Sequence, residues 1–128
     1  MGDSQSVLVV DDQKGVRRLL HEAFLMAGIS VEVAASGAEA LEKLGRREYS
    51  LMLLDVKMPG MTGIEALAEA RRRGHRIPVI LMTAYEELPL IKEASALDIL
   101  DHVIKPFDVM ELTRKISRWR SSPFEYRG

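Results

Sequence analysis

The sequence predicts a single α/β domain in which a parallel sheet is covered by helices on both faces. Its 128 residues suffice for one core, and a chain of this length needs neither disulfides nor a structural metal to fold. Short apolar runs and amphipathic stretches alternate five times along the chain. Because parallel strands need a right-handed crossover between them, this alternation predicts a doubly wound sheet built from five strand–helix units.

The predicted elements follow one another in strict alternation. The apolar runs expected to form strands are residues 7–10, 31–34, 51–54, 79–82 and 102–104. The amphipathic stretches expected to form helices are residues 16–27, 38–44, 64–70, 88–97 and 109–119. The first, third and fourth runs are apolar at successive positions, which is typical of strands covered on both faces, whereas the second alternates and the fifth is short. We therefore expect the strand order 2-1-3-4-5, with the second and fifth strands at the edges.

Capping signals and apolar faces support these helices. The capping pairs are Ser36 with Glu39, Thr62 with Glu65, and Asp108 with Glu111. The buried faces are expected to comprise Val16, Leu19, Leu20, Ala23, Phe24 and Ala27 in the first helix, and Val109, Leu112, Ile116 and Trp119 in the last. The basic run Arg71-Arg72-Arg73 is interpreted as the solvated end of the third helix, where positive charge complements the helix dipole.

The composition argues against several classes of function. Lys and Arg number 18 and Asp and Glu number 19, so the net charge of −1 argues against nucleic-acid binding. Cysteine is absent, which excludes thiol catalysis and Cys-based zinc sites. No apolar run approaches the roughly 18 residues of a membrane span, so we expect a cytoplasmic protein without membrane contact. Residues 1–6 are predicted to be a disordered tail and residues 121–128 a C-terminal tail, on either side of a domain of residues 7–120.

Five polar side chains are expected to meet at the carboxyl edge of the sheet. Asp11 and Asp12 follow the first strand, Asp55 the third, Thr83 the fourth and Lys105 the fifth. Ligands of open α/β sheets bind at this edge, beside the point where the strand order reverses. Carboxylates crowded there repel one another, by roughly 4 kcal/mol for a pair about 4 Å apart. Lys105 offsets part of this charge, and the all-oxygen donor set favours Mg²⁺ held by Asp11, Asp12 and Asp55.

These groups suit phosphoryl transfer. Asp55 closes the most buried of the predicted strands and is the carboxylate that we expect to accept the phosphoryl group. Catalysis of this transfer depends on positioning and on neutralising the phosphoryl oxygens, which Thr83 and Lys105 are placed to do. The loop of residues 56–60 comes next, and its backbone, including the carbonyl of Lys57, is expected to reach the metal and the phosphate.

Four motifs resemble the receiver domain of bacterial response regulators. They are VLVVDDQ, LLDVKMPGMTGIE, PVILMTA and KPF, in this order and spacing over nearly the whole chain. The resemblance implies a flavodoxin-like fold, Mg²⁺-dependent phosphorylation of Asp55 by a phosphohistidine, and a cis peptide bond between Lys105 and Pro106. It also implies a phosphoacceptor that assists its own phosphorylation and dephosphorylation, and not an enzyme in the ordinary sense.

Within that family, the chain is similar to receivers that stand alone in a phosphorelay, between a sensor histidine kinase and a histidine phosphotransferase. The residues that carry this likeness are Asp11-Asp12-Gln13 with Gly15 and Arg17, Lys57, Met82-Thr83-Ala84-Tyr85 with Glu87-Leu88, and His102 before Val103-Ile104-Lys105-Pro106-Phe107. The expected partner-binding residues are Gln13, Gly15, Arg17, Arg18, Tyr85, Pro106 and Phe107, and the expected state is a monomer or a weak dimer. The lack of an output domain after the last predicted helix favours this hypothesis.

A second hypothesis is a phosphorylation-dependent binding switch that engages an effector through the fourth helix, fifth strand and fifth helix, without onward transfer. Its switch residues would be Thr83 and His102, because His102 stands where many receivers carry a Tyr or Phe. The other interpretation of His102 is a partly exposed residue of an edge strand.

A phosphatase with an aspartyl nucleophile is disfavoured, since Lys57 stands where the second acid of an Asp-x-Asp pair would serve. Asp98 replaces a Gly common in receivers, and Asp tolerates a positive φ better than most residues.

Overall fold

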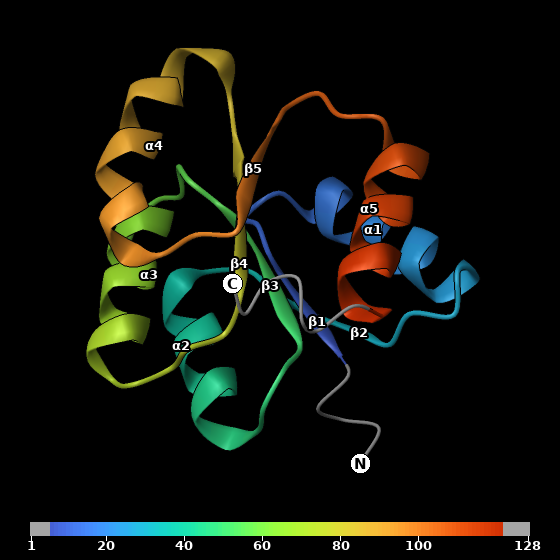
Figure 1. The fold of residues 1–128 in the computed structure, drawn as a ribbon, viewed down its shortest axis with the longest axis horizontal. Helices are drawn as coiled ribbons and strands as arrows, with labels where there is room; N and C mark the ends of the chain where they lie inside the picture. Colours follow the sequence, from blue (N-terminus) through green and yellow to red (C-terminus); the bar gives the residue numbers. More distant parts are fainter. Residues whose placement is uncertain (1–5, 122–128) are drawn as a thin grey trace.

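The computed structural model describes residues 6–121 as one five-stranded sheet surrounded by helices (Figure 1). The strands are β1 (Val7–Val10), β2 (Val31–Ala34), β3 (Leu51–Asp55), β4 (Val79–Thr83) and β5 (Asp101–Ile104). The helices are α1 (Lys14–Met26), α2 (Gly37–Arg46), α3 (Gly63–Arg72), α4 (Leu88–Ala94) and α5 (Val109–Ser121), and the 3₁₀ turns η2 (Tyr85–Glu87) and η3 (Ser95–Leu97) flank α4. Every predicted element is present, and the predicted helix 88–97 is divided into α4 and η3.

The strands lie in the order β2-β1-β3-β4-β5, and all neighbours are parallel, as predicted. β1, β3 and β4 are buried along their whole length, whereas the edge strands β2 and β5 are partly exposed. The register pairs Val10 with Leu54, Asp55 with Met82, and Thr83 with Ile104. The carboxyl ends of these strands therefore meet at one edge of the sheet.

Two hydrophobic cores lie on the two faces of the sheet. Helices α1 and α5 cover one face, and α2, α3 and α4 cover the other (Figure 1). Successive residues of β1 alternate between them: Val7 and Val9 pack on the α1–α5 side, and Leu8 and Val10 on the opposite side. Within residues 6–121, no helix combines the length and apolar character needed to cross a bilayer.

The predicted caps at α2 and α3 are present with different geometry. At α3, the Thr62 hydroxyl accepts from the Glu65 N–H at 3.1 Å, and the Glu65 carboxylate accepts from the Thr62 N–H at 2.9 Å, which completes the capping box. At α2, the Ser36 hydroxyl accepts from the Glu39 N–H at 3.1 Å. The Glu39 carboxylate instead accepts from the N–H of Ala35 at 2.8 Å, one residue before the expected position.

The predicted core face of α1 is too wide. Leu20 and Phe24 are fully buried, but Leu19 is 50% exposed and Ala27 is exposed. The helix turns only a narrow stripe toward the sheet, so the outer residues of the predicted stripe face solvent.

The predicted N-terminal tail extends one residue too far. Ser6 is fully buried, its hydroxyl lies 2.7 Å from the hydroxyl of Ser30, and its carbonyl accepts from the N–H of Ser50 at 2.8 Å. These bonds join the start of β1 to the segments before β2 and β3. At the other end, Ser121 belongs to α5 rather than to the predicted tail. Residues 1–5 and 122–128 of the predicted tails lie outside the described residues.

The interpretation of the basic run in α3 is correct for Arg72 and Arg73, which are exposed, and wrong for Arg71. The half-buried guanidinium of Arg71 donates, over 2.8 to 2.9 Å, to the carbonyls of His75, Ile77, Leu97 and Asp98. Its burial lowers the pKa of Arg71. Asp98 has the left-handed φ of 64° that the sequence made plausible. Arg71 thus ties the end of α3 to the chain that enters β5.

Replacing Arg71 tests this connection. Arg71→Gln is expected to lower the free energy of unfolding by about 2 to 4 kcal/mol, because four carbonyls lose their charged donor. Urea unfolding followed by circular dichroism measures the change. Arg72→Gln is the matched control on the next, exposed position, and its midpoint should stay close to that of the wild type. Equal midpoints for the two variants would contradict the structural role of Arg71.

Candidate functional site

Three predicted site residues, from three different strands, are in direct contact. Asp11 follows β1, Asp55 ends β3, and Lys105 follows β5. The Lys105 Nζ lies 2.7 Å from Asp11 Oδ2 and 3.1 Å from Asp55 Oδ1. The side chain of Asp11 is fully buried, and that of Lys105 is 22% exposed. One ammonium is therefore shared between two carboxylates that are largely withdrawn from water, where their attraction is stronger than at the surface.

Main-chain contacts hold Asp11 in place. Its N–H donates to the carbonyl of Ala34 at 3.1 Å, and its Oδ1 accepts from the N–H of Gln13 at 2.9 Å. The guanidinium of Arg17 donates to the carbonyl of Asp11 at 2.9 Å. Because these bonds leave only Oδ2 for Lys105, the carboxylate has one fixed orientation toward the site.

Asp12 completes a cluster of three carboxylates. Oxygens of Asp11, Asp12 and Asp55 lie within 4.8 Å of one another, and Asp12 is exposed while the other two are buried. When all three are ionised, three negative charges face the single charge of Lys105. A hard divalent cation prefers such oxygens and keeps water on its open side, so this donor set fits Mg²⁺. Lys57, whose carbonyl is the predicted fourth protein ligand, follows Asp55 by two residues and has an exposed side chain.

The electrostatics of the cluster shift the pKa values of two groups in the same direction. The pKa of Asp55 is raised from 3.8 to about 6, chiefly by burial and next by the charge of Asp11, although the hydrogen bond from Lys105 lowers it. Burial also lowers the pKa of Lys105, but its bonds to Asp11 and Asp55 outweigh burial and raise it. Lys105 is therefore charged throughout the neutral range.

The raised pKa of Asp55 makes a prediction about stability. Between pH 3.8 and about 6 the folded protein binds more protons at Asp55 than the unfolded chain does, so this group destabilises the fold as pH rises. In EDTA, Asp55→Asn is expected to raise the free energy of unfolding by about 1 to 2 kcal/mol near neutral pH, a value reduced for water at the open side of the cluster. The gain should vanish below about pH 4.

Urea titrations of both proteins at several pH values measure this difference. Adding Mg²⁺ should stabilise the wild type more than Asp55→Asn, because a cation relieves the same repulsion. A variant that is no more stable than the wild type at neutral pH would contradict the charge crowding at Asp55.

Gly63 is a positioning residue that the sequence reasoning missed. It is the first residue of α3, and a Cβ there would lie 2.0 Å from the carbonyl oxygen of Asp55 and 2.9 Å from the Cα of Val56. Its N–H also donates to the carbonyl of Val56 at 2.7 Å. The helix thus begins in contact with the main chain of Asp55. The only signal in the sequence is its place directly after Thr62, the N-cap of α3.

Gly63→Ala tests this close approach. The added methyl group must push the main chain of Asp55 aside, so we expect unfolding to become easier by about 2 kcal/mol or more and Mg²⁺ affinity to fall. Denaturant unfolding and isothermal titration calorimetry with Mg²⁺ measure the two effects. Gly45→Ala, in α2, is the control, because nothing lies within 4 Å of the added Cβ and Ala favours a helix. Similar behaviour of the two variants would argue against the contact.

Thr83 lies at the predicted edge, but its hydroxyl does not bond to the acidic cluster. It is fully buried at the end of β4, next to β3. Its Oγ1 lies 3.1 Å from the carbonyl oxygen of Ala84 and 3.3 Å from Oε1 of Glu87. For the part of the chain that the structure describes, the hydrogen bonds of Thr83 thus lead into the turn after β4 and not to Asp55. The sequence contains no clear signal for Glu87 as a partner.

The predicted partner-binding residues are close in sequence to the site residues, and they differ in solvent exposure. Those that are exposed are Gln13, Gly15, Arg18, Tyr85 and Pro106. Arg17 is half-buried and its bond to Asp11 commits it to the site's own backbone, whereas Arg18 pairs with Glu22 at 3.5 Å on the surface. Phe107 packs against the α1–α5 core. The exposed members are therefore better placed to meet a partner than Arg17 or Phe107.

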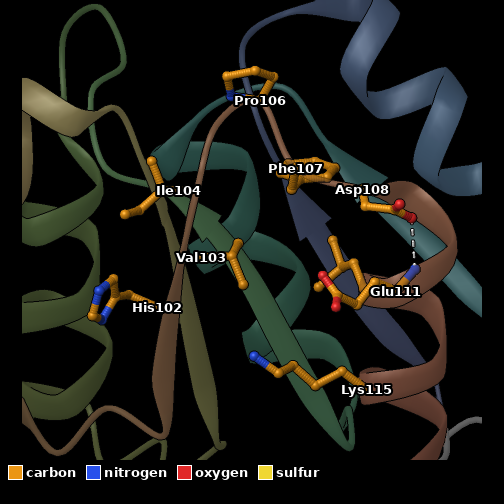
Figure 2. A pocket seen from close by; sticks show the side chains of 9 residues that line it. His102, Val103, Ile104, Pro106, Phe107, Asp108, Glu111 and Lys115 are labelled. Carbon is orange, nitrogen blue, oxygen red and sulfur yellow. Dashed lines mark hydrogen bonds between the residues drawn. The ribbon is translucent and has the colours of Figure 1, made fainter.

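A groove of about 360 Å³ lies between β5 and α5 (Figure 2). Figure 2 shows His102 and Val103 on opposite sides of β5, with Val103 toward α5. His102 is half-buried, and its backbone N–H donates to Asp101 Oδ1 at 2.7 Å. At the start of α5, Asp108 accepts from the N–H of Glu111 at 2.9 Å, which is the predicted cap. The switch role of His102 stays a prediction.

A doubly wound sheet with an acidic cluster and a lysine at its carboxyl edge is the arrangement of a receiver domain. The chain belongs to this family: the model described as the response regulator receiver domain matches residues 7–117. The resemblance of the four motifs is thereby confirmed, as is the flavodoxin-like fold. The peptide bond between Lys105 and Pro106 is cis, as the resemblance implied.

Several named proteins are similar to this chain. Sporulation initiation phosphotransferase F of Bacillus subtilis (strain 168) is 41% identical over 116 residues, covering 91% of this chain and 94% of that protein. Regulatory protein AtoC of Escherichia coli (strain K12) is 43% identical over 112 residues, 88% of this chain but 24% of that protein. Vibrio cholerae chemotaxis protein CheY4 superposes with a TM-score of 0.82 and 30% identity, over 89% of this chain and 97% of that one. TrrA of Thermotoga maritima, solved with Mg²⁺ and BeF, has a TM-score of 0.78 and 34% identity over the same shares, 89% and 97%.

Proposed function

We propose that this receiver accepts a phosphoryl group on Asp55 from the phosphohistidine of a sensor histidine kinase. The observation that carries the proposal is the position of the Asp55 carboxylate, 3.1 Å from the Lys105 ammonium and within 4.8 Å of the acids Asp11 and Asp12. In the transfer, an Asp55 oxygen bonds to phosphorus as the P–N bond breaks, and the electron pair stays on the imidazole nitrogen. With a pKa of about 6, Asp55 is mostly ionised, and hence nucleophilic, at neutral pH.

Lys105 and Thr83 would bind the oxygens of the transferred group. Lys105 is already at Asp55, and its raised pKa keeps the positive charge that the phosphoryl oxygens need. Asp11, Asp12, Asp55 and the carbonyl of Lys57 would hold Mg²⁺. That ion would neutralise the phosphoryl oxygens and so reduce the repulsion between them and the acids. The residues position and neutralise, and the chain serves as a phosphoacceptor that assists its own phosphorylation and dephosphorylation.

We further propose that the phosphoryl group passes from Asp55 to a histidine phosphotransferase, as one step of a phosphorelay in the cytoplasm. Support comes from the similarity to sporulation initiation phosphotransferase F, which covers 94% of that protein. The acyl phosphate bond breaks as a histidine nitrogen of the acceptor bonds to phosphorus, and the Asp55 carboxylate is restored. Exposed Gln13, Gly15, Arg18 and Tyr85 would meet the partners, and the chain would act as a monomer or a weak dimer without nucleic acid or membrane contact.

A binding switch without onward transfer is the second candidate. The groove between β5 and α5 favours it, since it offers a recess on the chain's edge strand (Figure 2). So does the similarity to a chemotaxis protein at 30% identity. In this candidate, phosphorylation would move Thr83 and His102 and thereby change the groove.

Phosphotransfer profiling tests both candidates. Radiolabelled, autophosphorylated histidine kinases of the source cell are mixed with the wild type, with Asp55→Asn and with Glu42→Gln, an exposed control on α2. We expect label on the wild type and on Glu42→Gln, and a loss of at least about a hundredfold on Asp55→Asn, because the amide is not a nucleophile. EDTA should prevent labelling.

A chase with the histidine phosphotransferases of the same cell separates the two candidates. Label that moves from the receiver to a phosphotransferase within minutes supports the relay. Label that stays on the receiver in every chase supports the switch instead. Labelled Asp55→Asn would contradict both candidates.

A further inference from the structure

Among the described residues, the hydroxyl of Thr83 bonds within the turn after β4 and not to Asp55, the acid that it is proposed to serve. Thr83 and Asp55 end neighbouring strands, β4 and β3, and both are buried. A hydroxyl has one proton to donate. Here the possible acceptors are the carbonyl of Ala84, at 3.1 Å, and Oε1 of Glu87, at 3.3 Å. Both acceptors belong to the turn that leads from β4 to α4 at the top of the molecule (Figure 1).

Glu87 holds this turn together. Its Oε1 accepts from the N–H of Ala84 at 2.9 Å as well as approaching the Thr83 hydroxyl, so one carboxylate oxygen closes the turn η2. A carboxylate can only accept hydrogen bonds, and such charge-assisted bonds are stronger than neutral ones. Glu87 is half-buried, whereas its neighbour Glu86 is exposed.

We propose that Glu87 is a positioning residue that keeps the Thr83 hydroxyl directed into the turn until a phosphoryl group forms on Asp55. The inference rests on the proposed function and deepens it. The phosphoryl oxygens and the Glu87 carboxylate are rival acceptors for the same proton. When the phosphoryl group wins, Thr83 turns toward Asp55, and Glu87 loses one of the two donors that hold the turn.

The turn connects the site to the protein surface. Tyr85 lies in η2 between Thr83 and Glu87 and is 74% exposed. Release of Thr83 therefore loosens the segment that presents Tyr85, one of the expected partner-binding residues. Phosphorylation of the buried Asp55 carboxylate would thereby change how the exposed Tyr85 ring is held, through the turn after β4. The relative strength of the Glu87 carboxylate and the phosphoryl oxygens as acceptors determines how readily Thr83 is released.

Glu87→Gln weakens one acceptor and leaves the geometry nearly intact. The amide oxygen can still accept from the N–H of Ala84, but it carries no charge, so its hold on Thr83 is weaker. We expect the apparent affinity for beryllofluoride in the presence of Mg²⁺, a phosphoryl analogue, to rise by about three- to tenfold. Glu86→Gln removes the same charge one residue away and should change the affinity less than about twofold.

A double-mutant cycle links the effect to the hydroxyl. In a Thr83→Val background, Glu87→Gln should change beryllofluoride affinity by less than about twofold, because no hydroxyl is left to compete for. An undiminished effect in that background, or an equal effect of Glu86→Gln, overturns the proposal. Thermal unfolding of each variant, with and without beryllofluoride, provides a second readout: stabilisation by the analogue must rise in Glu87→Gln whatever its basal stability.

The failures of the two proposals are distinguishable. Wild type that binds beryllofluoride but shows no change on Glu87→Gln leaves Asp55 as the acceptor and rules out the role of Glu87. Wild type that neither binds beryllofluoride nor accepts label on Asp55 overturns the proposed function, and the role of Glu87 with it.

Discussion

The ammonium of Lys105, placed between the carboxylates of Asp11 and Asp55, is the interaction on which the site depends. Two buried carboxylates that both contact one ammonium are close enough to repel each other strongly. A buried charge without a partner is also costly. The lysine offsets that cost only if β1, β3 and the end of β5 reach the same edge of the sheet. The parallel order β2-β1-β3-β4-β5 brings them there. When Asp12 is counted, one positive charge still faces three negative charges. This excess of negative charge favours binding of a cation, and a bound cation in turn favours a phosphoryl group.

Much of this arrangement could be predicted from the sequence, because it depends on local patterns that the fold obeys directly. Runs such as Leu51–Asp55 are apolar at every position up to the final acid, which marks a central strand and the place where it ends. Once the strands are known to be parallel, their carboxyl ends must share an edge, so residues far apart in the chain converge without any knowledge of their contacts. Thr62 and Glu65 likewise carry their own geometry within four residues.

The residues that escaped prediction depend on contacts between distant segments. Arg71 looks like any basic residue near a helix end, and its four carbonyl partners become visible only when the chain before β5 is in place. Leu19 fits a helical period but lies beyond the edge of the contact with the sheet. For Gly63, the sequence shows only a small residue after an N-cap. A glycine is needed there because the main chain of Asp55 leaves no room for a Cβ. Spacing alone contains no information about such approaches.

The two sides of the site differ in their freedom to respond to a new charge. Asp55 ends a strand with neighbours on both sides, and α3 begins against its main chain. Displacement there would disturb the two hydrophobic cores, and tightly packed interiors yield little. Thr83 ends the strand next to the half-exposed edge strand β5, and its partners belong to a short turn. A rearrangement of the Thr83 side chain breaks hydrogen bonds within a turn in which Tyr85 and Glu86 are exposed. When charge is added at Asp55, we therefore expect the structural change to occur at the end of β4, in the turn after it and in β5. Asp55 itself is expected to stay in place.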